Sequence, residues 1–134
     1  MFLSTITEYL KESVLDLALI LVEADKDFYE SAPAIMESFK NRLSITSNPK
    51  KRELKEILES LSGADITDKK KILFEITCLV YSDNIFSDTE REIFKEVTNA
   101  FQIEDDFVYR SIEIADDLNM LYYKANKLVT GKGG

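Results

Sequence analysis

One stretch of this chain is repeated within it. Residues 14–45 align with residues 72–103 without a gap, at the constant offset of 58 positions that separates Asp25 from Asp83. Eight of the 32 aligned pairs are identical, whereas composition gives about two matches at a random offset. The identical pairs are Leu15/Leu73, Leu21/Leu79, Val22/Val80, Asp25/Asp83, Phe28/Phe86, Ile35/Ile93, Asn41/Asn99 and Ile45/Ile103. A fixed-period repeat of this length predicts a duplicated helical unit.

Helix-breaking residues are rare along the chain. It has four Gly and two Pro in 134 residues, and three of the Gly lie in the last four positions. Few breakers and no alternating apolar pattern predict an all-α fold. We expect a compact bundle of about six or seven helices with the internal pseudo-repeat 14–45 and 72–103. Residues 1–130 then form one domain, and 131–134 form a flexible tail.

Two segments are apolar on nearly all sides and predict buried central helices. Between Val14 and Val22 only Asp16 is polar, and the second segment spans residues 71–82. Helix starts are expected at Ser4, at Asn48-Pro49 and after Thr67. In the last helix we expect one inward stripe, made by Phe107, Ile112, Ala115, Leu118, Tyr122 and Ala125.

The composition excludes several catalytic arrangements. The chain has no His, so it has no His general base and no His metal ligand. Its only cysteine, Cys78, cannot form an internal disulfide, and its place in an apolar helix predicts an inert core thiol. These absences favour a non-enzymatic protein.

The net charge of −8 limits the partners. An acidic chain repels nucleic-acid phosphates and anionic membranes, so we expect neither as a partner, whereas cations or a basic protein surface are attracted. The start Met1-Phe2-Leu3-Ser4 lacks a signal-peptide pattern, and the longest apolar stretches are too short to span a bilayer. We therefore expect a cytoplasmic protein that does not insert into membranes.

The connection inside each repeat holds the most informative motif. In the second repeat it reads Ser82-Asp83-Asn84-Ile85-Phe86-Ser87-Asp88-Thr89-Glu90, in which Ser87 and Glu90 fit a capping box. This pattern resembles the TerB-like family associated with tellurite resistance, whose repeats carry a motif close to A-D-G-x-(apolar)-(D/S/T)-x-x-E. The resemblance covers both repeats and the helix between them. In the second connection Asn84 replaces the Gly of the motif, and in the first only Asp25 and Phe28 fit.

Two interpretations of these connections stay open. Family members have been proposed to bind divalent metal through such acids, which implies a Ca²⁺ or Mg²⁺ site from Asp83, Asp88, Glu90 and Asp25. In the structural interpretation, Asp83 forms a local turn, Ser87 and Glu90 cap a helix, and Phe28 and Phe86 are buried core residues.

The first function hypothesis is a protein-interaction or scaffolding module. The resemblance implies a role in tellurite or other stress response and a protein partner in a membrane-linked complex. The alternative is a divalent-cation binding or sensing protein, and a third hypothesis is a small-molecule enzyme that relies on carboxylates. Asp16, Glu23 and Glu75 lie on the buried helices, where we expect them at a polar edge or in inter-helix bonds.

Overall fold

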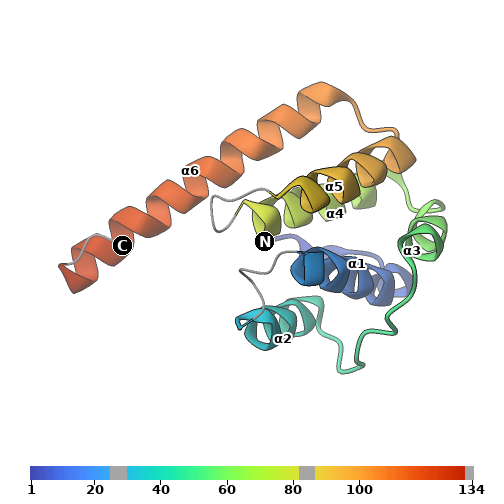
Figure 1. The fold of residues 1–134 in the computed structure, drawn as a ribbon, viewed down its shortest axis with the longest axis horizontal. Coiled ribbons are helices and arrows are strands. Elements are labelled where there is room, and N and C mark those ends of the chain that lie inside the picture. The colour runs from blue at the N-terminus through green and yellow to red at the C-terminus, as the bar shows by residue number, and fades with distance from the viewer. Residues whose placement is uncertain (25–29, 82–86, 132–134) are drawn as a thin grey trace.

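A computed structural model describes residues 1–24, 30–81 and 87–131. Two short 3-10 turns, Leu3–Thr5 and Glu8–Leu10, precede six α-helices. The helices are α1 (Lys11–Ala24), α2 (Ala32–Leu43), α3 (Leu54–Leu61), α4 (Ile66–Val80), α5 (Asp88–Phe101) and α6 (Asp105–Thr130) (Figure 1). No strand occurs in these residues, which confirms the all-α prediction.

Helices α1 and α4 form the centre of the bundle. Helix α1 contacts α2, α3, α4 and α5, and α4 also contacts α5 and α6. Val14, Leu17 and Leu21 of α1 are completely buried, as are Ile72 and Ile76 of α4. The two apolar segments are therefore the central helices, as their sequence predicts.

The two repeated segments share a detail at their ends. The C-cap residue of α2 is Ser44 (φ 60°) and that of α5 is Gln102 (φ 53°), which are equivalent positions of the repeat. The next amide in each case donates to a helical carbonyl: Ile45 N to Lys40 O at 3.1 Å and Ile103 N to Thr98 O at 3.4 Å. Both helices thus end in the same left-handed cap. The superposition of residues 14–45 on residues 72–103 stays a prediction. The expected burial of Phe28 and Phe86 also stays a prediction, because both lie outside the described residues.

Two predicted helix starts are wrong, and tertiary hydrogen bonds hold both segments in other conformations. The chain near Ser4 forms 3-10 turns, since the Phe2 amide donates to Glu75 and the Thr7 hydroxyl donates to Asp68. The helix expected from Pro49 begins only at Leu54. A third start is shifted by a better cap, because the Asp65 carboxylate accepts from the Asp68 amide at 2.8 Å and begins α4 before Thr67.

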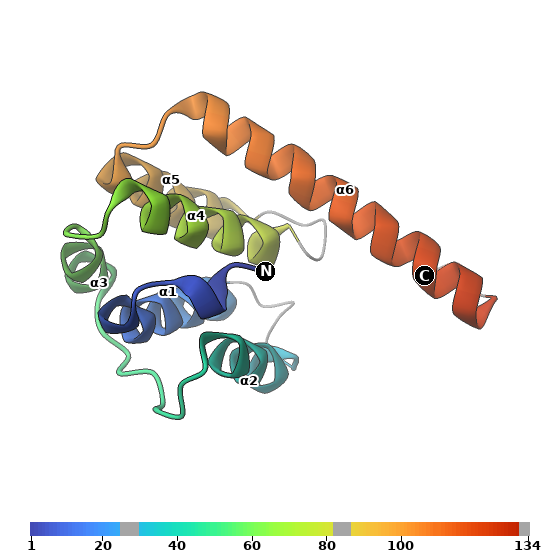
Figure 2. The ribbon, with the colours of Figure 1, turned by 180° about the vertical axis from the view of Figure 1, so that it is seen from behind.

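Helix α6 extends well beyond the rest of the bundle. Its N-terminal half lies along α4 and its C-terminal half projects past the other helices (Figures 1 and 2). Ser111 and Ala115 are its only buried residues. The expected inward stripe is therefore wrong at Tyr122 and Ala125, which are exposed because the body ends before them. No helix among the described residues is long and apolar enough to cross a membrane.

Candidate functional site

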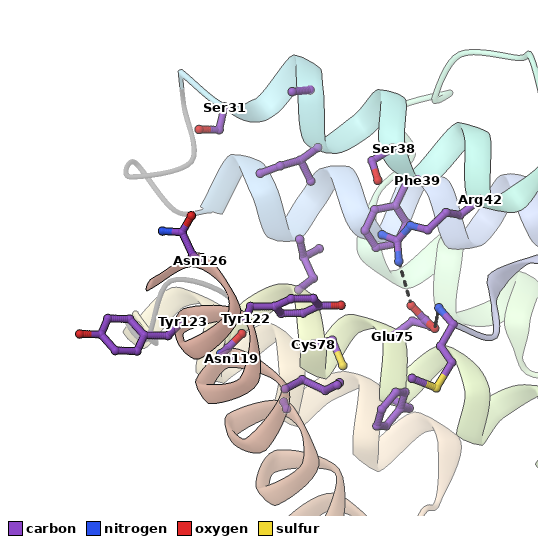
Figure 3. Close-up of a pocket in the computed structure, with 17 residues that line it drawn as sticks. Ser31, Ser38, Phe39, Arg42, Glu75, Cys78, Asn119, Tyr122, Tyr123 and Asn126 are labelled. Carbon is purple, nitrogen blue, oxygen red and sulfur yellow. Dashed lines mark hydrogen bonds and ion pairs between the residues drawn. The ribbon is translucent and has the colours of Figure 1, made fainter. Parts of the chain in front are cut away.

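A cleft of about 750 Å³ lies between α2, α4 and α6. Figure 3 shows that each helix contributes one wall. The apolar lining comes from Met1, Ala34, Ile35, Phe39, Phe74, Leu79, Ala115 and Leu118, and the polar or aromatic lining from Ser31, Ser38, Arg42, Glu75, Cys78, Asn119, Tyr122, Tyr123 and Asn126. The cleft is thus mostly apolar, with polar groups at one end and along its edge.

Glu75 is the buried charge of the cleft, with 3% of its side chain exposed. Its Oε1 accepts the Phe2 amide at 2.7 Å and lies 2.9 Å from the Met1 amino nitrogen. Its Oε2 lies 3.4 Å from Nη1 of Arg42 on α2. A buried carboxylate needs such donors, because desolvation of the charge is costly. Glu75 therefore joins α4 to α2 and to the first residues of the chain.

Two aromatic contacts surround this ion pair. The Arg42 guanidinium lies over the Phe39 ring at 4.7 Å from its centre, a cation–π distance. The Phe2 and Phe74 rings meet edge to face with centres 5.6 Å apart. These contacts pack Arg42 against Phe39 and Phe74 against Phe2 at this end of the cleft.

Cys78 lies on the α4 wall and is half-buried. Burial, with a smaller contribution from the nearby Glu75 charge, raises the pKa of its thiol to about 11. A thiol with this pKa is protonated at neutral pH and is a weak nucleophile. The inert thiol predicted from the sequence agrees with this pKa, although Cys78 faces the cleft rather than the core.

Helix α6 is held to the end of α4 by a side-chain hydrogen bond. The Asn119 amide nitrogen donates to the Tyr81 carbonyl oxygen, next to the cleft. Burial raises the pKa of the Tyr81 phenol. One turn beyond Asn119, Tyr122 points toward the cleft, whereas Tyr123 points away from it (Figure 3). Tyr122 remains 70% exposed, so this edge presents an aromatic ring to any molecule that enters.

Two of the four carboxylates proposed as metal ligands, Asp88 and Glu90, do not line this cleft. They lie in the first turn of α5, and Asp25 and Asp83 lie outside the described residues. The predicted capping box is confirmed: the Ser87 amide donates to Glu90 Oε1 and the Glu90 amide donates to Ser87 Oγ, both at 3.1 Å. One oxygen of Glu90 is thus engaged by the cap. Across residues 1–24, 30–81 and 87–131, no group of three or more Cys, Asp and Glu side chains is placed to hold a metal ion.

The sequence predicts Glu75 at a polar edge or in an inter-helix bond, but it does not reveal the cleft around this residue. Phe39 and Arg42 lie on α2, and Tyr122 lies far from them in the sequence on α6, so only tertiary packing brings the three residues to one cleft. One feature of the sequence does indicate a binding surface here. The pair Tyr122-Tyr123 lies on a helix with apolar residues on more than one face, and these cannot all be buried.

The chain matches no family model and has no significant match among curated proteins or solved structures.

Proposed function

We propose that this protein is a non-enzymatic protein-binding module that receives an apolar segment of a partner protein in the cleft between α2, α4 and α6. The observation that carries the proposal is the cleft of about 750 Å³, whose walls are apolar and whose edge is a projecting helix with exposed aromatic rings. Amphipathic helices bind such grooves by inserting side chains that are three and four residues apart.

The polar groups of the cleft support a protein ligand over a small polar substrate. Small-molecule sites combine apolar walls with a few polar groups directed at the ligand. Here Glu75 already accepts the Phe2 amide and pairs with Arg42, and the Cys78 thiol is protonated at neutral pH. What the cleft offers is chiefly apolar surface. The resemblance to TerB-like proteins adds the expectation of a tellurite or stress-response setting with a partner in a membrane-linked complex.

Site-specific photo-crosslinking in the native host tests this proposal. A benzophenone amino acid at Ser38, which is exposed and lines the cleft, should give a discrete crosslinked product with a second protein. The matched control is the same amino acid at Glu37, an exposed neighbour outside the cleft. The product should disappear when Ala34→Glu places a charge on the cleft wall. The same product from both positions, or none from Ser38, would contradict the proposal.

The alternative function, divalent-cation binding, depends on the acidic connection before α5. Asp88 supplies an exposed carboxylate there, five positions after Asp83 in the sequence. Because the capping box engages Glu90, this alternative centres on Asp83 and Asp88 and predicts weak binding, since a tight Ca²⁺ site needs about six or more oxygen ligands. Amide NMR with millimolar Ca²⁺ or Mg²⁺ tests it. Shifts confined to residues 83–90 and lost in Asp83→Asn favour the alternative, whereas diffuse shifts over all acidic surfaces exclude it.

A further inference from the structure

Helix α6 carries a second apolar surface, which shares only Leu118 with the cleft. Apolar residues recur along it at alternating spacings of four and three positions, which is the a/d pattern of a coiled coil. This seam consists of Ile114, Leu118, Leu121, Ala125 and Leu128. Over this length it spans about 21 Å at the rise of an α-helix.

The seam is open to solvent along most of its length. Ile114 is 47% exposed, Leu121 is 59% exposed and Leu128 is 85% exposed. None of these three residues lines the cleft. The seam lies on a face of α6 beside the one that packs on α4, because Ser111 and Ala115 are the buried positions of the helix. A partner helix can therefore lie along α6 without displacing α4.

The charges of α6 are divided between its two halves. The N-terminal half carries five acidic residues and one Arg, whereas the charged residues of the C-terminal half are Lys124 and Lys127. Two copies of this helix in antiparallel orientation bring each acidic half beside a basic half, and their helix dipoles also oppose one another. In parallel orientation the acidic halves face each other. The charges of α6 are therefore complementary to those of a second copy only when the two helices are antiparallel.

We infer that α6 mediates an antiparallel homodimer through the seam. The two helices are aligned so that Leu118 of one copy packs beside Leu121 of the second copy. In the same alignment Ile114 of one copy packs beside Ala125 of the other. Asp117 and Lys124 occupy the same flanking heptad position, g. In antiparallel coils g residues meet g residues, so Asp117 of each copy lies beside Lys124 of the other. Each dimer contains this ion pair twice.

Charge exchange at these two positions tests the dimer. Sedimentation equilibrium of the full chain should show a species of twice the 15.4 kDa monomer mass at high micromolar concentration. Leu121→Asp should give a monomer. Asp117→Lys and Lys124→Asp should each raise the dimer dissociation constant about tenfold, because each creates two like-charge contacts. The double variant Asp117→Lys/Lys124→Asp should restore the wild-type value, which only antiparallel pairing explains.

Matched controls carry the same charge changes on the opposite face of α6. Asp116→Lys and Lys127→Asp should leave the dissociation constant unchanged. Circular dichroism should show equal helicity in every variant, since all the altered side chains are exposed. A monomeric wild type, a dimer that survives Leu121→Asp, or single and double charge variants with equal effect would overturn the inference. The photo-crosslink at Ser38 lies on α2, so its result is independent of this one.

Discussion

Asp16 and Glu75 are both buried carboxylates on the central helices, but they lie in different surroundings. Asp16 on α1 is 1% exposed; its two oxygens accept the Lys50 amide and Nε of Arg52, each at 2.7 Å. Glu75 on α4 is 3% exposed and is bonded to the first residues and to Arg42, but it stands at the end of an open cleft. Both carboxylates are therefore buried and paired with an Arg side chain. They differ in that only Glu75 lines the cleft.

The difference shows that a buried charge does not by itself mark a functional site. Arg52 also donates to Ser13 Oγ at 3.0 Å and to Ser60 Oγ at 3.1 Å, so the Asp16 network ties α1 to α3 and to the segment before it. That network serves the fold. The groups around Glu75 join elements that also bound a space for a ligand. We expect the Asp16 region to govern stability and the Glu75 region to govern the properties of the cleft.

The largest expected effect on stability is that of Asp16→Ala. This substitution removes the acceptor of the Lys50 amide and the only carboxylate that pairs with the partly buried Arg52 guanidinium among the ion pairs described, and we expect a loss of about 3 kcal/mol in the free energy of unfolding. Urea unfolding followed by circular dichroism measures it. The control is Glu12→Ala, because Glu12 forms an exposed ion pair with the Lys50 side chain at 2.9 Å and its removal should leave the midpoint unchanged. A loss below about 1 kcal/mol for Asp16→Ala would show that the network does not hold the fold.

The second prediction concerns the pH dependence of Cys78. Folding raises the pKa of this thiol from 9.0 to about 11, so the thiolate is depleted in the native protein below that pH. At pH 8 we expect the native protein to react with a disulfide reagent about 100-fold more slowly than the urea-unfolded chain. The native rate should keep rising with pH up to about 11. Equal rates for the folded and unfolded chains would place the thiol in open solvent.

A smaller effect on stability is expected for Glu75→Gln. The amide oxygen can still accept the Phe2 amide, and Arg42 is partly exposed, so we expect a loss of about 1 kcal/mol. The same substitution removes the negative charge that helps to raise the Cys78 pKa, so the thiol should react faster at pH 8. Asp16→Asn is the matched control for the thiol measurement, since it also neutralises a buried acid but lies on α1. An equal increase in both variants would indicate general loosening of the fold.

The same comparison shows what the sequence could predict. The central helices, the Ser87–Glu90 capping box and the all-α class follow from local pattern, because apolar periodicity and caps are properties of neighbouring residues. The start of α3 could not be predicted this way. The segment before it is held by Asp16, which is 34 positions away from Lys50 in the sequence. At Lys51 the backbone is left-handed (φ 58°), so a helix cannot run through from Pro49.

The cleft was unpredictable for a related reason. Periodicity identifies a helix and its apolar residues but does not indicate where the neighbouring helix ends. The apolar pattern of α6 continues evenly from Phe107 to Ala125, so it predicts that Tyr122 and Ala125 face inward. In the structure the bundle ends first, and the continuing stripe becomes an exposed edge. The candidate site thus arises from a difference in length between α6 and the helices that it packs on.

The smallest effect on stability is expected for Tyr122→Ala. This variant also separates most sharply the role of the Asp16 region in stability from the role of the cleft in binding. Tyr122 is 70% exposed, so its removal should change the free energy of unfolding by less than about 0.5 kcal/mol. If the cleft binds a partner segment, the same substitution removes an aromatic wall and should abolish the crosslink formed from Ser38. The matched control is Tyr109→Ala, which removes an equally exposed Tyr from α6 outside the cleft and should leave the crosslink intact. Retention of the crosslink in Tyr122→Ala would show that α6 is not a wall of the binding surface, and loss in both variants would point to a general disturbance of α6.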